Sequence, residues 1–422
     1  MYLVIEMDKV YFCIDLKTFY ASVECVERGL DPFNTDLIVA DKERGKGSIC
    51  LAISPKMKKR GIRNRCRVFE IPAYVHPIVA KPRMKKYIEY SALIYKIYLK
   101  YISKEDIHVY SIDEAFLDVT NYLKMYKMSP TSLAKTILKD IYDSTGITAS
   151  AGIGTNLYLA KIALDIIAKH DKSNIAVLNE QRYRELLWHH IPLSDFWQIG
   201  IGTQRRLNKL HLKDMYDVVH ADEKVLYKEF GVNARYLIDH AKGIEPVTIA
   251  DIKRYKPKSN SISNSQVLFK DYSMDKARIV LIEMIESLVL QLVSKNLVTN
   301  SIGFIIGYSK DIASPLKVSK RFNIATSSYK KILDILLTEY DYQVRSDLMI
   351  RKIGIWFSVS EKCYEQLDLF SLESEDNDNI IEKTMLFIKN KFGKDSIMRG
   401  ISYVDGATQI MRNKLIGGHN AE

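Results

Sequence analysis

Three acidic residues are spaced so that their carboxylates could hold a divalent metal ion. Asp15 follows residues 9–14, an apolar, β-branched and aromatic run that is typical of a buried strand. Asp113 and Glu114 alone separate two further strand patterns, 107–112 and 115–120, so the two are expected at the turn of a tight hairpin. Carboxylates meeting at strand ends make a hard oxygen site suited to Mg²⁺. Two such ions, roughly 3.5–4 Å apart, can align the attacking and leaving oxygens of a phosphoryl transfer.

The surrounding sequence is more specific than the acids, because an Asp-Glu pair is also a common turn dipeptide. Residues 111–120 are Ser-Ile-Asp-Glu-Ala-Phe-Leu-Asp-Val-Thr, and residues 14–24 are Ile-Asp-Leu-Lys-Thr-Phe-Tyr-Ala-Ser-Val-Glu. Residues 151–163 are Ala-Gly-Ile-Gly-Thr-Asn-Leu-Tyr-Leu-Ala-Lys-Ile-Ala. These three segments resemble, in order and separation, the motifs of Y-family DNA polymerases. The resemblance covers nearly the whole chain and is nearest to the UmuC-like bacterial branch.

The resemblance implies roles for residues of the first two motifs. Asp15, Asp113 and Glu114 match the catalytic carboxylates that bind two Mg²⁺ ions, for which Mn²⁺ can substitute. Leu16 matches the residue whose backbone carbonyl completes the shell of one metal. Tyr20 matches the steric gate, an aromatic ring that would collide with a ribonucleotide 2′-hydroxyl. Without the motif, Tyr20 would be taken as a core aromatic of a helix.

Other matched positions are expected to bind the triphosphate of the incoming dNTP. Thr18 and Phe19 match backbone N–H groups that meet phosphates at a helix start. Lys58 and Lys169 match cations that the triphosphate requires, although a solvated surface lysine is the alternative for each. Pro55 departs from the family pattern, since many members have Tyr at this position.

Lys161 lies eight residues before Lys169 on the same expected helix, residues 157–169. Eight residues of α-helix would place the two lysines about 80° apart around the helix axis. Asp165 lies four residues from each and could pair with both. Lys161 is therefore expected near the active site, without an assigned role.

The length of 422 residues predicts three or four domains. With the resemblance, the fold class is α+β multidomain: a right-hand polymerase with a ferredoxin-like palm, small fingers, a helical thumb and a βαββαβ little finger. The expected ranges are palm 1–178 with fingers inserted at about 23–78, thumb 179–252, basic linker 253–261, little finger 262–360 and tail 361–422. The little-finger pattern is strand 262–269, helix 275–296, strands 300–308 and 316–324, helix 328–340 and strand 350–358. An acidic stretch, 371–382, predicts a further linker, followed by one helix at 380–392.

Two segments are expected to contact primer-template DNA. Residues 195–212 resemble a helix-hairpin-helix, in which Gly200 and Gly202 would let the backbone approach a phosphate. An ordinary helix-helix turn is the alternative. The basic linker adds four residues expected to meet phosphates: Lys253, Arg254, Lys256 and Lys258.

The residues Gln366-Leu-Asp-Leu-Phe370 resemble the pentapeptide that binds the bacterial sliding clamp. Gln366, Leu367, Leu369 and Phe370 would make the contacts, and the acidic stretch would leave them exposed. A short amphipathic strand packed on the domain's own core is the alternative. For the tail beyond it, the resemblance suggests a recombinase or UmuD-like accessory protein as a partner.

Composition agrees with an anionic partner. The net charge is +11 and the pI about 9.1, which favours nucleic acid. The five cysteines are scattered without metal-ligand spacing, and their odd number argues against a disulfide framework. The first residues lack a basic signal-peptide region, and charges interrupt every long apolar stretch. A cytoplasmic, nucleoid-associated protein with no membrane partner is expected.

The short segment between Val23 and about His76 leaves little room for a large closing helix. The resemblance therefore implies error-prone translesion synthesis in DNA damage tolerance and SOS mutagenesis, by template-directed transfer of a dNTP to a primer 3′-hydroxyl. Two other classes compete with this hypothesis. A nucleotide cyclase with a palm-like sheet would need a Gly-Gly-Asp/Glu-Glu-Phe turn, which the sequence lacks. A non-catalytic DNA-binding accessory would not need the intact carboxylates.

Overall fold

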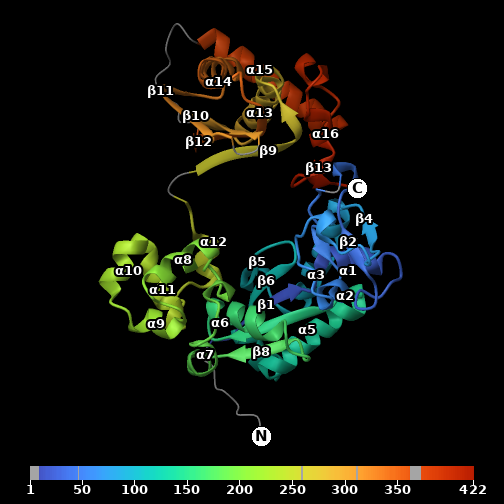
Figure 1. Ribbon diagram of the computed structural model, residues 1–422, viewed down its shortest axis with the longest axis vertical. Coiled ribbons are helices and arrows are strands. Elements are labelled where there is room, and N and C mark those ends of the chain that lie inside the picture. Colours follow the sequence, from blue (N-terminus) through green and yellow to red (C-terminus); the bar gives the residue numbers. More distant parts are fainter. Residues whose placement is uncertain (1–8, 46, 258–259, 310–311, 362–371) are drawn as a thin grey trace. The chain divides into compact units, whose positions relative to one another are not determined.

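The computed structural model describes residues 9–45, 47–257, 260–309, 312–361 and 372–422 (Figure 1). The chain forms two compact units that meet in sequence between Tyr255 and Lys256. The sequence predicts three or four domains, and this finer division stays a prediction. Residues 179–252 do not build a core of their own, because their apolar side chains, such as Leu226 and Ile249, join the core around Tyr158.

A five-stranded sheet, in the order β5-β6-β1-β7-β8, is the centre of the first unit. Its strands are β1 (Tyr11–Leu16), β5 (Ile107–Val109), β6 (Glu114–Asp118), β7 (Ala149–Gly154) and β8 (Ile175–Leu178). β1 is antiparallel to β6 and β7, and β8 is parallel to β7. The two-residue period of β1 places Cys13 and Asp15 on one face of the sheet and buries Phe12 and Ile14 on the other.

The predicted hairpin is present, but its limits differ from those expected. The turn is residues 110–113, and Glu114 is the first residue of β6. Asp15 likewise lies inside β1, because its backbone is paired with Glu114 on one side and Ser150 on the other. Two of the three carboxylates are thus fixed by the sheet's backbone pairing rather than by a turn.

The helices of this part are α1 (Phe19–Val26), α3 (Met84–Tyr101), α4 (Thr120–Tyr126), α5 (Pro130–Thr145) and α6 (Leu157–Ile162). The Asn156 side chain caps α6 by accepting from the Leu159 N–H at 2.8 Å. The helix predicted for 157–169 does not stay α-helical, since α6 passes into a π-helix, η4 (Ala163–Ala168). α6 and η4 cover β7 and the Cys13 face of β1.

α6 crosses β7 at very short range because β7 has glycine at two positions. A Cβ on Gly152 would lie 2.1 Å from the Ala160 carbonyl oxygen, and a Cβ on Gly154 would lie 2.2 Å from the Ala160 nitrogen. Both neighbours are backbone atoms, which cannot give way as a side-chain end can. The glycines of the third motif therefore set the distance between the sheet and the helix that carries Lys161.

A small subdomain within the first unit is built on a three-stranded sheet, β3-β2-β4. Its elements are β2 (Leu37–Val39), β3 (Ala52–Ile53), α2 (Pro55–Lys59) and β4 (Ile78–Ala80). Its own small core includes Ile38, Ile53 and Met57.

Six short helices complete the first unit: α7 (Glu180–Leu187), α8 (Ile201–Lys209), α9 (Met215–His220), α10 (Glu223–Phe230), α11 (Ala234–Ala241) and α12 (Ile249–Arg254). The basic linker predicted from residue 253 is wrong at its start, because Lys253 and Arg254 form the last turn of α12. Cations at a helix C-terminus are favoured by the helix dipole.

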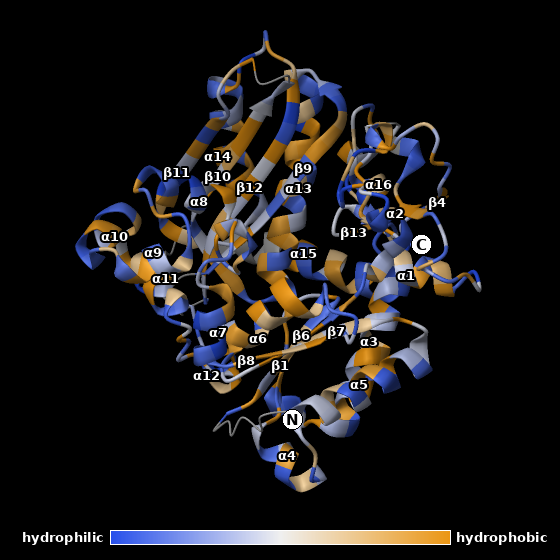
Figure 2. Cartoon of the chain, turned by 60° about the horizontal axis from the view of Figure 1, so that its bottom comes forward, coloured by the Kyte–Doolittle hydropathy of each residue, from blue (hydrophilic) through white to orange (hydrophobic). Residues whose placement is uncertain are grey.

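The second unit follows the predicted order of strand, helix, two strands, helix and strand. The elements are β9 (Asn260–Tyr272), α13 (Met274–Ser294), β10 (Leu297–Tyr308), β11 (Leu316–Thr326), α14 (Tyr329–Gln343) and β12 (Ile350–Glu361). The sheet order is β11-β10-β12-β9. Figure 2 shows hydrophobic residues along α13 and the strands that it covers, which together form the core of this unit.

The acidic linker predicted at 371–382 is wrong, since α15 (Leu372–Phe392) occupies this stretch. Acidic residues are favourable in the first turns of a helix, so their density is no sign of a linker. The remaining elements are η8 (Gly400–Tyr403), α16 (Gln409–Asn413), β13 (Leu415–Ile416) and β14 (His419–Asn420). The buried Glu283 of α13 accepts from the backbone N–H groups of Thr408 and Gln409 at 2.8 and 3.0 Å. This carboxylate anchors the tail to the second unit.

We predict that Gly152→Ala lowers the free energy of unfolding by about 3 kcal/mol or more, because the new methyl group meets the backbone of α6. The measurement is urea unfolding followed by circular dichroism. Gly202→Ala is the matched control: its Cβ would meet nothing within 4 Å. Unfolding midpoints that agree between the two variants would contradict the packing argument.

Candidate active site

The three predicted carboxylates lie at the same end of β1 and β6. Asp15 and Glu114 are paired directly across these strands, and the Leu16 N–H donates to the Asp113 carbonyl at 2.9 Å. Glu114 is 8% exposed, while the Asp15 and Asp113 side chains are half-buried. Backbone pairing thus brings the acids of two motifs, about a hundred residues apart in sequence, to one place.

Two lysines of the neighbouring helix pair with these acids. Lys161 Nζ lies 2.7 Å from the Glu114 carboxylate, and Lys169 Nζ lies 3.1 Å from Asp15 Oδ2. Asp165 bridges the lysines at 2.9 and 2.8 Å, so the predicted pairing of Asp165 with both is confirmed. The predicted 80° separation of the lysines does not apply, because the π-helix between them has wider turns than an α-helix.

The charges at this site are strongly coupled. Burial and the negative charges of Asp113 and Glu114 raise the pKa of Asp15 to about 6, against the opposing charge of Lys169. Burial would lower the pKa of Lys161, but the neighbouring Asp165 and Glu114 outweigh it, and the pKa is raised. The acids therefore repel one another and depend on the lysines for charge balance.

The oxygen atoms of Asp15, Asp113 and Glu114 are of the kind that binds a hard divalent cation, although the three side chains make hydrogen bonds and ion pairs with other residues. Within the described ranges, no group of three His, Cys, Asp or Glu side chains is arranged to hold a metal ion. Asp15 and Glu114 face the lysines, and Asp113 accepts from Ser111 Oγ at 2.6 Å. Carboxylate and carbonyl oxygens are the ligands that Mg²⁺ prefers. The nearby Cys13 donates its thiol proton to Glu114 at 3.2 Å, and burial raises the thiol pKa, so it adds no competing thiolate.

The residues expected to bind the nucleotide surround this cluster. Thr18 is the N-cap of α1 in a left-handed conformation, and Phe19 begins the helix. Lys58, on α2, lies close enough to Asp15 and Lys169 for their charges to shift its pKa. Desolvation and the positive charge of Lys169 lower the pKa of Lys58, while the negative charge of Asp15 raises it, and the net shift is downward. Pro55, where the family often has Tyr, starts α2, a position that suits the fixed proline φ.

Tyr20 is half-buried on α1, and its ring is stacked on that of Tyr87 with centroids 4.4 Å apart. The sequence alone assigns Tyr87 no role at the site. Its ring contact with Tyr20, 67 residues away in the chain, leaves no local signal in the sequence.

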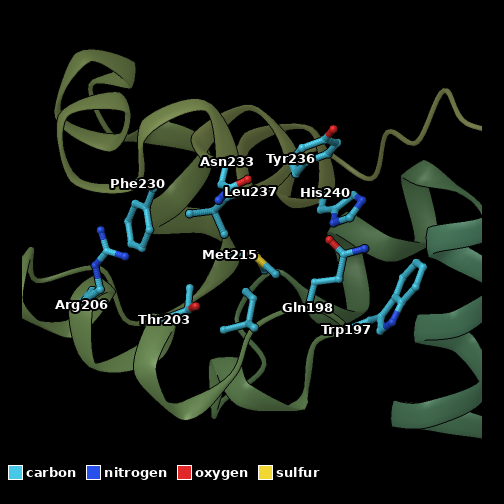
Figure 3. Close-up of a pocket in the computed structure, with 11 residues that line it drawn as sticks. Trp197, Gln198, Thr203, Arg206, Met215, Phe230, Asn233, Tyr236, Leu237 and His240 are labelled. Carbon is cyan, nitrogen blue, oxygen red and sulfur yellow. The ribbon is translucent and has the colours of Figure 1, made fainter. Parts of the chain in front are cut away.

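The hairpin also contacts the region expected to bind DNA. Trp197 Nε1 donates to the Tyr110 hydroxyl at 3.1 Å, and Lys161 Nζ lies 5.8 Å from the centre of the Tyr110 ring. Trp197 lines a pocket with Arg206 and His240 (Figure 3). Sequence reasoning missed this link, because nothing in the local pattern pairs Trp197 with Tyr110.

The predicted DNA contacts have the following positions. Gly200 is the N-cap of α8 and Gly202 lies in its first turn, and a Cβ on either would meet nothing within 4 Å. Lys253 donates to the Lys104 carbonyl, and Arg254 pairs with Asp251 at 2.8 Å. Lys256 is exposed. Lys258 and the pentapeptide 366–370 lie outside the described residues.

No helix among the described residues is long and apolar enough to span a bilayer.

Comparison with known proteins gives one consistent result. Residues 14–165, which contain all three motifs, match the impB/mucB/samB family. The chain is 32% identical to the UV-damage repair protein UvrX of Bacillus subtilis over 418 residues, covering 98% of each chain. It is 28% identical to DNA polymerase IV 2 of the same organism over 425 residues, covering 98% of this chain and 99% of the relative.

A solved structure agrees at the level of the fold. A Y-family DNA polymerase chimera of Dbh and Dpo4 superimposes with a TM-score of 0.63 at 23% identity, covering 83% of this chain and 98% of the chimera. The motifs around Asp15 and Asp113, the similarity over nearly the full length and the common fold lead to one conclusion: the chain belongs to the Y-family of DNA polymerases, enzymes of translesion synthesis and DNA repair.

Proposed function

We propose that this polymerase is error-prone and acts in DNA damage tolerance and SOS mutagenesis by two-metal-ion nucleotidyl transfer from a dNTP to the primer 3′-hydroxyl. One observation carries the proposal. Asp15 and Glu114 are paired across adjacent strands, next to Asp113, and their charge is balanced by Lys161 and Lys169. An acidic cluster held beside cations suits a site where metal ions and a triphosphate are exchanged in every cycle.

Asp15, Asp113, Glu114 and the Leu16 carbonyl would hold the metal, Mg²⁺ or Mn²⁺. When bound, the metal supplies Lewis acidity at the primer hydroxyl and at the leaving pyrophosphate. The carboxylates would hold the metal charge at the strand ends. Because that charge would itself activate the primer hydroxyl, no strong protein base is required.

The remaining residues of the site bind and select the nucleotide. Lys58 and Lys169 would neutralise the triphosphate, and the N–H groups of Thr18 and Phe19 would donate to it at the start of α1. The Tyr20 ring would stand where a ribose 2′-hydroxyl would collide with it. This arrangement selects deoxynucleotides by shape rather than by a hydrogen bond.

We assign the parts of the chain to the right-hand plan: palm 1–178, fingers at about 23–78, thumb 179–252 and little finger 262–360. The fingers subdomain supports low fidelity, since its α2 has only five residues and cannot close over a nascent base pair. Gly200 and Gly202, in open space at the start of α8, would admit a DNA phosphate. Lys253, Arg254, Lys256 and Lys258 would add charge beside the DNA backbone.

The deciding experiment is primer extension on a primed template with Asp113→Asn. We predict a loss of about a thousandfold or more in extension rate, because a charged oxygen ligand is removed. DNA binding should be retained. Asp118→Asn, at the other end of β6, is the control, and its extension should be close to that of the wild type. Extension by Asp113→Asn at the wild-type rate would refute the assignment.

The same assay separates the polymerase from its competitors. A cyclase would consume nucleotide without a template, and a DNA-binding accessory would not extend the primer at all. Incorporation that follows the template base distinguishes the proposed function from both.

We also propose that Gln366, Leu367, Leu369 and Phe370 bind the bacterial sliding clamp, as their pattern suggests. Burying Leu369 and Phe370 would contribute roughly 1.5–3 kcal/mol each, so Leu369→Ala with Phe370→Ala should weaken clamp affinity at least tenfold. Clamp-free extension should be unchanged.

The measurement is a titration with the sliding clamp. It records the affinity of the polymerase for the clamp and the rate of extension on a primed circle at each clamp concentration. Asp368→Ser is the control, because Asp368 is not among the four residues expected to contact the clamp. Equal clamp affinity for the double variant and the wild type would remove the proposal.

A further inference from the structure

The ring of Tyr20 rests on a second aromatic ring that is fixed in the core. Tyr20, on α1, and Tyr87, in the first turn of α3, stack with an interplanar angle of 16° and centroids 4.4 Å apart. Tyr20 is half-buried, whereas Tyr87 is 0% exposed. One face of the Tyr20 ring is therefore covered, and an incoming sugar can meet only what is left open.

Tyr87 is held in place by a buried carboxylate. Its hydroxyl donates to Glu24 Oε1 at 2.8 Å, and Glu24 is 0% exposed. Arg83 donates to both oxygens of Glu24 at 3.0 Å each, a two-point bond that fixes the carboxylate plane. Arg28, in the turn that follows α1, donates to the same group.

The charge of this carboxylate is secured by its partners. Burial would raise the pKa of Glu24, but the hydrogen bonds from Arg83, Arg28 and Tyr87 outweigh it, and the pKa is lowered. Glu24 therefore stays ionised and keeps the Tyr87 hydroxyl in one orientation. Tyr87 cannot rotate away without leaving a buried charge short of a hydrogen bond.

A steric gate excludes a ribose only if the ring that forms the gate cannot move aside. A tyrosine side chain turns about two bonds, and a half-exposed ring would move aside at small cost unless something opposed it. The stacked ring of Tyr87 removes that freedom. Offset or parallel aromatic contacts of this kind add stabilisation beyond the area that they bury.

We propose that Tyr87, fixed by Glu24 and Arg83, is the positioning residue that holds Tyr20 in place and so sets the discrimination between deoxyribonucleotides and ribonucleotides. Tyr87 acts through Tyr20 and touches no substrate itself. The inference rests on the proposed role of Tyr20 as the steric gate.

The test is the ratio of kcat/KM for a dNTP to that for the rNTP of the same base, measured in single-nucleotide incorporation. This ratio is independent of the active fraction of each preparation. Tyr87→Met and Tyr87→Leu, two ringless replacements of different shape, should each lower it about threefold to tenfold. Measuring both keeps the test decisive if one of them fails to fold. Tyr87→Phe keeps the stacked ring but loses the hydrogen bond to Glu24, so its ratio should fall between those of the ringless variants and the wild type.

Two further variants separate this role from general packing. Tyr90 also lies on α3, is half-buried like Tyr20 and donates to Glu27 at 2.8 Å, but its ring does not stack on that of Tyr20, so Tyr90→Leu should leave the ratio unchanged. On a Tyr20→Ala background, adding Tyr87→Leu should have no further effect, because nothing is left to position.

The inference is overturned if Tyr20→Ala lowers the ratio and the ringless Tyr87 variants do not, or if the double variant falls below Tyr20→Ala alone. An unchanged ratio in Tyr20→Ala would instead refute the gate itself, and the positioning role with it.

Discussion

Carboxylates taken out of water need a cation beside them, and this constraint governs the first unit of the chain. Strand pairing sets Asp15 opposite Glu114, and Asp165 adds a further negative charge from the helix. Lys161 and Lys169 supply the compensating charge, so the helix that carries them must lie close to the sheet. That closeness explains Gly152, where any side chain would meet the helix backbone. The glycine of the third motif is therefore needed so that the lysines of the helix can reach the carboxylates of the first two motifs.

Two acid clusters of this unit are paired with different cations. Glu24 is gripped by the planar guanidinium of Arg83 at both oxygens, which suits a carboxylate that must not move. Asp15 and Glu114 meet lysine ammonium groups, which are single-point partners on flexible stems. Such partners can withdraw when a metal ion and a triphosphate bring charges of their own. The site would thus be adaptable at the proposed metal ligands and rigid behind Tyr20, the proposed steric gate.

The sequence predicts what is local or carried by a motif, and it fails where distant segments meet. Strand patterns and the order of the second unit follow from hydrophobic periodicity, and Asp165 pairs with both lysines as its spacing suggests. The predicted hairpin limits are wrong because Asp113-Glu114 suits a turn, whereas backbone pairing extends β6 to Glu114. The acidic stretch at 371–382 has the composition of a linker but satisfies a helix start. The contacts between Tyr20 and Tyr87 and between Tyr110 and Trp197 join segments that are far apart in the sequence, so no local sequence pattern predicts them.

The central claim is that the carboxylates at the joined ends of β1 and β6 are the cation site of this polymerase. The most direct measurement is Mn²⁺ binding, followed by electron paramagnetic resonance, to the complex with a dideoxy-terminated primer-template and the matching dNTP. The wild-type protein should bind Mn²⁺ at least about tenfold more tightly than Glu114→Gln, which keeps the shape of the side chain but loses its charge. Equal Mn²⁺ affinity and stoichiometry in the two complexes would contradict the account.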